Sequence, residues 1–245
     1  SDQVITGRIQ VSKYARNQVA GTQQPEAGAI FRVWLKSASS YDKAKDSERD
    51  MITVGKDGKG TSKNLPYGTY CLQQVSGWTG YDLDETIYEV AITEHGKTVT
   101  ADTSGNQLEL HNNIWTGKLI IRKVDGDTQE PLANAMFTLT GSDGSKQVVG
   151  TDGNGTAFFE NLVYGVTYTW TETSAPHGYL LDESSTGTWT VSKHDDSITV
   201  TCENKRRPGS IRFQAGCRWP PASRLYLPAG ILRRKPVEAR YNALQ

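Results

Sequence analysis

The sequence predicts an all-β protein made of two tandem β-sandwich domains. Its 245 residues are enough for two domains of about 100 residues each. Glycine is frequent, and threonine, valine and tyrosine recur at alternating positions, as is typical of strands. Short strand-like segments bounded by turn signals occur about seven times per hundred residues, which favours a sandwich.

Charge and cysteine content bear on the class of function. Lys plus Arg and Asp plus Glu both total 27, so no net charge attracts the chain to nucleic acid. No apolar run approaches the ~20 residues of a membrane-spanning helix. Cys71, Cys202 and Cys217 form no CxxC motif, and the four histidines are scattered. We therefore expect no cofactor, no metal ion, no nucleic-acid partner and no membrane span.

Each half of the chain opens with a strand that carries a lysine on its apolar face. Side chains alternate along a strand, so Leu119, Ile121 and Lys123 point the same way. An earlier stretch places Ile9, Val11 and Lys13 in the same pattern. An inward lysine is costly unless it is paired or chemically altered.

The repeat continues along both halves and sets the domain boundaries. Further matched features follow in the same order in both halves. Second strands are expected at 29–35 and 135–140, and hairpin turns at Asp57-Gly58 and Asp152-Gly153. Gly80-Tyr81 then matches Gly178-Tyr179, and Asn112 matches Asn204. Domain one therefore spans 5–115 and domain two 116–207, with almost no linker.

A polar insertion, residues 37–50, distinguishes domain one. We interpret it as a solvated helical turn or loop between strands. Two acidic groups are alternative metal sites: Asp42, Asp46 and Asp50 in the insertion, and Asp125, Asp127 and Glu130 in domain two. The second group lacks the ligand spacing of a calcium loop, and we interpret both as solvated segments.

Three polar residues of domain two end otherwise apolar stripes. Lys123 follows Ile121, Glu172 follows Trp170, and Asn204 follows Cys202 on their respective strands. Burial lowers the pKa of a lysine and raises that of a glutamate. A neutral amine beside a carboxamide and a carboxylic acid can undergo amide exchange, which leaves a Lys–Asn isopeptide bond and releases ammonia. The alternative is a buried Lys–Glu ion pair with Asn as its hydrogen-bond partner.

Two stretches of domain two carry a resemblance to a known family. They are Gly117-Lys118-Leu119-Ile120-Ile121-Arg122-Lys123-Val124-Asp125 and Glu172-Thr173-Ser174-Ala175-Pro176-His177-Gly178-Tyr179. They resemble Cna B-type (SpaA-type, prealbumin-like) repeat domains of Gram-positive surface adhesins and pilins, and the resemblance covers about residues 7–214. It implies immunoglobulin-like sandwiches and an isopeptide bond in which Lys123 is the nucleophile, Asn204 the acceptor and Glu172 the proton shuttle.

Domain one departs from this pattern at the acid. Lys13 and Asn112 match Lys123 and Asn204, but Gln74 takes the position of Glu172. A carboxamide can donate a hydrogen bond and cannot shuttle a proton, so a Lys13–Asn112 bond remains an open alternative to an uncrosslinked domain. Asn113 is a second candidate acceptor, although alternation points it to the other face. Cys71 beside the glutamines suggests a thioester, but it lies opposite the core stripe of its strand.

The resemblance implies a structural stalk or spacer of a cell-wall-anchored adhesin or pilin. Such a protein is extracellular, is no enzyme apart from single-turnover self-crosslinking, packs against neighbouring domains of its own chain and joins peptidoglycan through a sortase signal outside this fragment. Two alternatives stay open: a module that binds a glycan or host matrix protein through Trp78 and Trp115, and an accessory sandwich domain of a secreted hydrolase.

The segment 208–245 is expected to be an unstructured tail. A third copy begins at Gly209, but Ala215 replaces the expected lysine and strand patterns stop there. We interpret 208–245 as the truncated start of a third repeat followed by an out-of-frame tail, with a basic linker as the alternative.

Overall fold

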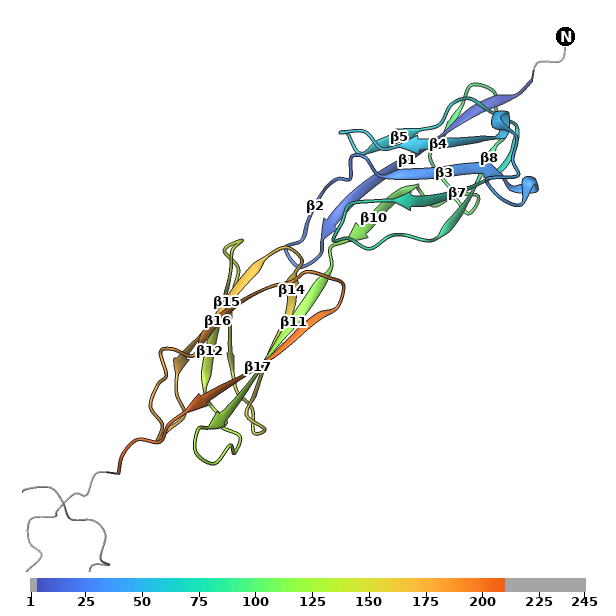
Figure 1. Ribbon diagram of the computed structural model, residues 1–245. Helices are drawn as coiled ribbons and strands as arrows, with labels where there is room; N and C mark the ends of the chain where they lie inside the picture. Colours follow the sequence, from blue (N-terminus) through green and yellow to red (C-terminus); the bar gives the residue numbers. More distant parts are fainter. Residues whose placement is uncertain (1–3, 210–245) are drawn as a thin grey trace, which may run out of the picture. The chain divides into compact units, whose positions relative to one another are not determined.

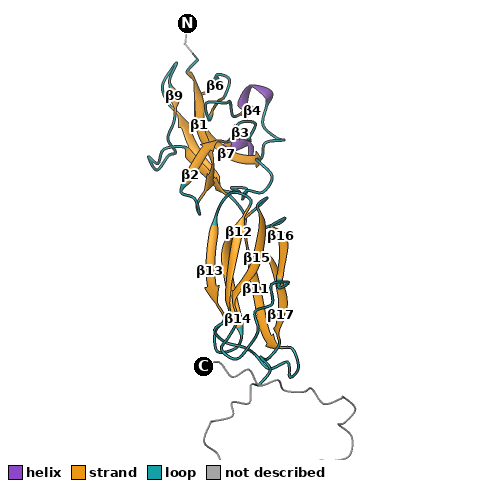
Figure 2. Ribbon diagram, turned by 90° about the vertical axis from the view of Figure 1, so that its left-hand side faces the viewer, coloured by secondary structure: helices purple, strands orange, loops and turns teal. Residues whose placement is uncertain are grey.

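Residues 4–209 are described by a computed structural model, and they form two tandem β-sandwiches (Figure 1). Strands dominate, and two short 3-10 turns are the helical elements of the described residues (Figure 2). The predicted class, two tandem prealbumin-like β-sandwiches, is confirmed. The prediction for the C-terminal tail concerns residues that, from 210 onward, lie outside the described part.

The first sandwich packs two sheets against each other. One sheet has the order β10-β1-β2, and β1 also pairs with β5, β6 and β9; the other has the order β4-β3-β7-β8. The strands are β1 Thr6–Asn17, β2 Thr22–Pro25, β3 Ile30–Leu35, β4 Arg49–Thr53, β5 Lys59–Thr61, β6 Leu65–Pro66, β7 Gly68–Ser76, β8 Ile87–Ile92, β9 Thr98–Val99 and β10 Glu109–Asn113.

The second sandwich has a three-stranded and a four-stranded sheet. Their orders are β14-β11-β17 and β13-β12-β15-β16. The strands are β11 Thr116–Asp125, β12 Met136–Gly141, β13 Lys146–Gly150, β14 Thr156–Val163, β15 Thr167–Ser174, β16 Thr186–Thr190 and β17 Asp196–Asn204.

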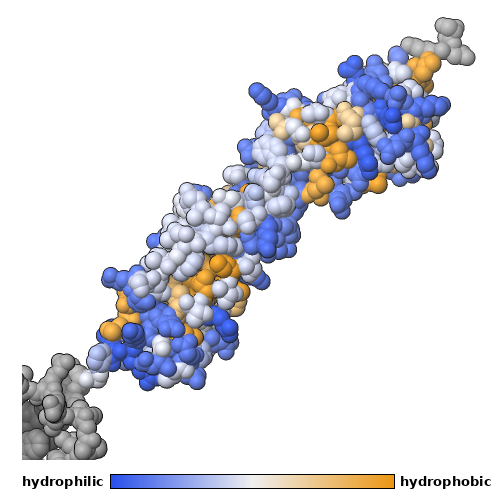
Figure 3. Space-filling view, in the orientation of Figure 1, coloured by the Kyte–Doolittle hydropathy of each residue, from blue (hydrophilic) through white to orange (hydrophobic). Residues whose placement is uncertain are grey.

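Alternation along the strands places one apolar stripe of each strand in the core. On β11, every second residue from Gly117 to Asp125 is buried, and Leu119 and Ile121 lie fully inside. On β1, Ile9 and Val11 do the same for the first sandwich. The face seen in Figure 3 is largely hydrophilic or neutral, with small hydrophobic areas over each sandwich. The core stripes therefore carry both lysines, Lys13 and Lys123, inward.

The first and last strands of each sandwich run parallel and adjacent. In the second sandwich, β11 pairs with β17, and Lys123 lies opposite Cys202. In the first, β1 pairs with β10, and Lys13 lies opposite Leu110. In both, the candidate acceptor asparagine comes two residues after the lysine's partner, so it returns to the same face of the sheet.

The polar insertion after β3 contains the two 3-10 turns, η1 Lys36–Ala38 and η2 Asp46–Glu48. Arg49 stabilises the loop, since its guanidinium forms an ion pair with Asp46 at 2.7 Å and donates to the carbonyl of Tyr41. No helix within residues 4–209 has the length and apolar character needed to span a lipid bilayer.

Candidate functional site

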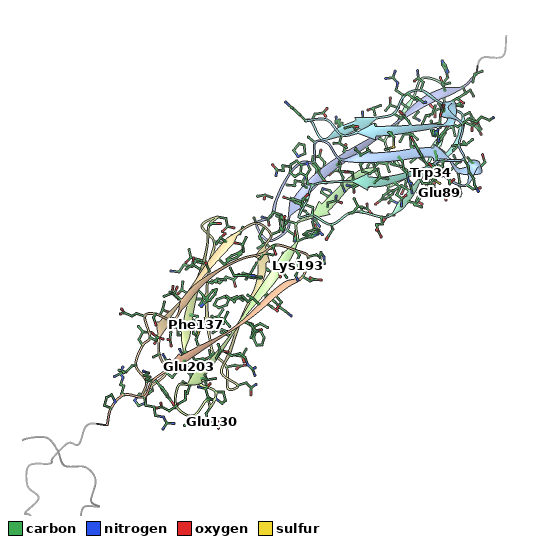
Figure 4. The ribbon with its side chains drawn as sticks, viewed as in Figure 1. Trp34, Glu89, Glu130, Phe137, Lys193 and Glu203 are labelled. Carbon is green, nitrogen blue, oxygen red and sulfur yellow. The ribbon has the colours of Figure 1, made fainter. Side chains whose placement is uncertain are left out.

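The second sandwich holds Lys123 in a fully buried position between its two sheets. The ammonium lies 5.7 Å from the ring centre of Phe137, which Figure 4 labels inside the same sandwich. Glu172 reaches the same point from β15, because Phe137 on β12 is its cross-strand partner. Asn204 reaches it from the end of β17. The structure thus brings together the three residues that alternation placed on inner faces.

One carboxylate oxygen of Glu172 contacts both nitrogens of this group. Lys123 Nζ donates to Glu172 Oε2 at 2.9 Å, and Asn204 Nδ2 donates to the same oxygen at 3.0 Å. Lys123 Nζ also donates to the backbone carbonyl of Glu203 at 3.0 Å. Exposed fractions are 0% for Lys123, 2% for Glu172 and 1% for Asn204, so water is excluded from the group.

Two buried oxygens of the group have no hydrogen-bond donor among the described residues. They are Glu172 Oε1 and Asn204 Oδ1. A buried acceptor without a partner costs about 1–3 kcal/mol. Both atoms are acceptors, so neither can satisfy the other.

The first sandwich places Lys13 and Asn112 together in the equivalent position. Lys13 Nζ donates to Asn112 Oδ1 at 2.6 Å, and both residues are buried. Burial lowers the pKa of Lys13 to about 8, against the opposing effect of the carboxylates of Glu26 and Asp84. The amine therefore loses its proton more readily than an exposed lysine does.

A carboxylate that sequence reasoning missed, Glu26, completes this group. Asn112 Nδ2 donates to both of its oxygens, at 3.3 Å to Oε1 and 3.1 Å to Oε2, and Glu26 is fully buried. It lies between β2 and β3, where strand alternation assigns no face. The repeat could have revealed Glu26. The segment 26–31 aligns with 132–137, and in that alignment Glu26 takes the position of the apolar residue Leu132.

Gln74 occupies the place that the sequence predicted for it, at the register position of Glu172. It pairs with Phe31 across the sheet, as Glu172 pairs with Phe137. Its amide nitrogen donates to the carbonyl of Ser76 at 3.1 Å. Gln74 thus bonds to backbone groups, and the carboxylate of this group comes from Glu26.

The other candidates from the sequence lie away from these two groups. Asn113 points outward and accepts a hydrogen bond from Arg16 Nε at 2.8 Å. Cys71 is half-buried and lies opposite Glu89 of β8, and burial raises the pKa of its thiol. Trp78 donates its indole N–H to the carbonyl of Ala27, and Trp115 packs edge-on against Tyr164.

Three of the acidic residues weighed as metal ligands have other partners. Asp125 is buried and accepts hydrogen bonds from Arg206 Nε at 2.7 Å and from the Tyr179 hydroxyl at 2.8 Å. Asp46 pairs with Arg49, and Asp50 accepts the backbone N–H of Lys63. Within the described residues, no three His, Cys, Asp or Glu side chains gather closely enough to hold a metal ion.

Comparisons with known proteins agree with this architecture. Residues 7–107 and 117–206 match the sequence profile of the SpaA prealbumin-like fold domain. None of the curated protein sequences compared with the chain matches it.

Solved structures similar to this chain include proteins of bacterial pili. The Bacillus anthracis TIE protein is 27% identical, with a TM-score of 0.65 over 82% of this chain and 34% of its own. A C-terminal fragment of the pilus adhesin SpaC from Lactobacillus rhamnosus GG is 18% identical, with a TM-score of 0.50 over 85% of this chain and all of its own. The shaft pilin SpaA from the same organism is 17% identical, with a TM-score of 0.34 over 84% of this chain and all of its own.

Proposed function

Since this chain belongs to the SpaA prealbumin-like fold domain family, we propose that it is a spacer in the stalk of a bacterial adhesin or pilin. In this proposal the protein is extracellular and joins the cell wall of a Gram-positive bacterium through a sortase signal elsewhere in the protein. Its partners are the neighbouring domains of the same chain. Its only chemistry is single-turnover self-crosslinking.

The self-crosslinking part of the proposal rests on one observation: Glu172 Oε2 accepts hydrogen bonds from both Lys123 Nζ and Asn204 Nδ2. Glu172 takes a proton from Lys123, and the neutral Nζ attacks Cγ of Asn204. The carboxyl group then protonates Nδ2, the Cγ–Nδ2 bond breaks, and ammonia leaves. Glu172 finally takes the surplus proton of the new amide nitrogen, so one Lys–Asn amide and one ammonia form and the atoms balance.

Burial supplies the conditions for this reaction. All three groups are held in contact and away from water, which is equivalent to an effective molarity of order 10⁵ M or more. No other enzyme is then required. The ion-pair alternative keeps the same contacts without the covalent step, and it predicts the full sequence mass.

Mass spectrometry separates these two alternatives. We expect a proteolytic digest to contain a branched peptide that joins Lys123 to Asn204 and is one ammonia lighter than its two parts. Glu172→Gln preserves the size of the side chain and should abolish that peptide, whereas Glu160→Gln on the exposed face of β14 should leave it intact. A wild-type digest with only linear Lys123 and Asn204 peptides would refute the crosslink.

The ligand-binding alternative receives no support from the two tryptophans that suggested it. Trp78 is half-buried and hydrogen-bonded to the backbone, and Trp115 is half-buried against Tyr164. Both side chains are engaged in contacts within the chain, so we retain the structural role.

A further inference from the structure

The two sandwiches supply a carboxylate to the same place from different strands. In the second, Glu172 comes from β15 and contacts Asn204 Nδ2 at 3.0 Å. In the first, Glu26 comes from the segment after β2 and contacts Asn112 Nδ2 at 3.1 Å. Each carboxylate therefore touches the nitrogen that would leave as ammonia.

Backbone hydrogen bonds show which positions of the two sandwiches correspond. The N–H of Glu26 donates to the carbonyl of Lys13 at 3.0 Å, and the N–H of Leu132 donates to the carbonyl of Lys123 at 2.8 Å. Glu26 thus replaces an apolar residue, while Gln74 replaces Glu172. In each sandwich one glutamate contacts the asparagine, but it comes from position 26 in the first and from the position equivalent to Gln74 in the second.

Gly77 provides the space for the relocated carboxylate. A Cβ at this position would lie 2.5 Å from Glu26 Oε1, 2.8 Å from Gln74 Nε2 and 3.1 Å from Asn112 Nδ2. The φ angle of Gly77 lies outside the left-handed region, so the glycine is needed here for space. The equivalent residue of the second sandwich is Ala175, where no such carboxylate has to fit.

Trp78 provides a hydrogen bond that the second sandwich cannot make. Its backbone N–H donates to Glu26 Oε1 at 2.7 Å. The equivalent residue is Pro176, which has no N–H. Four positions therefore differ together: the acid is at position 26, a glutamine replaces it at position 74, Gly77 leaves space for it and Trp78 donates an N–H to it.

From this concerted exchange we infer that Glu26 is the acid that promotes a Lys13–Asn112 amide crosslink in the first sandwich. The inference rests on the proposed self-crosslinking chemistry and assigns a catalytic residue that the repeat pattern alone does not reveal. Neutral Lys13 Nζ attacks Cγ of Asn112, whose oxygen it already contacts at 2.6 Å. Glu26 first takes the proton that Lys13 releases and then gives it to Nδ2. The Cγ–Nδ2 bond breaks, ammonia leaves, and Glu26 takes the surplus proton of the new amide nitrogen, so one amide and one ammonia form.

The experiment uses the full chain and maps both crosslinks separately. We expect the wild type to lose two ammonia and to yield two branched peptides. Glu26→Gln should release only one ammonia, and its digest should lack only the Lys13–Asn112 peptide. Glu172→Gln should likewise lack only the Lys123–Asn204 peptide. A wild type with the Lys123–Asn204 peptide alone would overturn the role of Glu26 and leave the proposed function standing.

Two further variants separate acid chemistry from folding. Gly77→Ala changes none of the three reacting residues and should reduce the yield of the Lys13–Asn112 peptide at least severalfold, because the new methyl group displaces the Glu26 carboxylate. The exchange Glu26→Leu with Gln74→Glu and Gly77→Ala returns the acid to the position used in the second sandwich and should restore the peptide. Full crosslinking in Glu26→Gln, or none in a folded exchange variant, would assign Glu26 a packing role.

Discussion

At the scale of single residues, the two buried lysines determine what each sandwich can do. A charged amine removed from water is expensive unless a carboxylate pairs with it or it reacts. Lys123 has a carboxylate at 2.9 Å, whereas Lys13 is bonded at 2.6 Å to a neutral carboxamide oxygen. Among the described residues, Lys13 therefore has no carboxylate within hydrogen-bond distance, and its burial favours the uncharged amine.

The pKa of Lys13 leads to a prediction about pH. Its pKa is about 8 in the folded chain against 10.5 ordinarily, so the unfolded state binds more protons between these values. Stability of a first sandwich with a free Lys13 amine should therefore rise with pH in this window, by about 1–2 kcal/mol after allowance for solvent screening. Glu26→Gln should leave the Lys13 amine free, so amide hydrogen exchange of β1 in this variant measures the change in stability with pH.

The wild type is the control for this measurement, because an amide-linked Lys13 has no amine to titrate. Glu26 and Asp84 are the carboxylates that raise the pKa of Lys13, and Glu26→Gln removes the first of them. Protection of β1 that stays level or falls relative to the wild type between pH 8 and 10 would contradict the prediction.

Most residues of the two groups could be predicted from the sequence, and the exception has a physical reason. Strict alternation along β11 and β17 fixed the faces of Lys123 and Asn204, and burial agrees with it. Glu26 follows β2 in a segment without a period of two, so its direction depends on how the chain turns into β3. Only the hydrogen bond of its N–H to the carbonyl of Lys13 places it.

At the scale of elements, a cluster of hydrogen bonds around Asp125 holds the end of β17 to β11, in addition to the candidate crosslink. Asp125 at the end of β11 accepts hydrogen bonds from Arg206 and Tyr179. Arg206 follows β17 in the chain, and Tyr179 follows β15. The hydrogen bond from Arg206 holds the pKa of Asp125 well below its usual range. The carboxylate therefore stays charged in mild acid.

Removal of this carboxylate should loosen the end of β17. Asp125→Ala leaves the Tyr179 hydroxyl and the backbone N–H of Asp127 without their acceptor, so amide exchange over residues 202–206 should accelerate at pH 7. Asp127→Ala, at an exposed neighbouring position, is the control. Because the folded pKa is depressed, the stabilisation exists above the ordinary value of 3.8 and is lost as pH falls below it.

Equal exchange rates in Asp125→Ala and Asp127→Ala would show that this cluster does not hold the strand. The sequence suggested only a solvated acidic turn here, because the partners are distant in the chain. Tyr179 is 54 positions away and Arg206 is 81 positions away. Parallel pairing of the first and last strands brings them together, and no local pattern encodes that pairing.

At the scale of the whole molecule, the strand order determines how load passes through each sandwich. The first and last strands are adjacent and parallel, so force applied to the two ends of a sandwich shears β11 against β17. In an uncrosslinked sandwich, only non-covalent contacts resist this shear: the hydrogen bonds between the two strands, the packed core and the Asp125 cluster. A covalent bond between Lys123 and Asn204 would bypass them and, by analogy with disulfide loop closure, would stabilise the fold by roughly 4 kcal/mol for a loop of about 80 residues.

Single-molecule stretching tests this transmission of load directly. In the wild type, the chain between Lys123 and Asn204 lies outside the force path, so the second sandwich should show no unfolding step. Glu172→Gln should release about 80 residues, which adds ~280 Å of contour length at ~3.5 Å per residue. Glu160→Gln, with its exposed side chain, should behave as the wild type. A full-length unfolding step in the wild type would mean that β17 is held by non-covalent contacts alone.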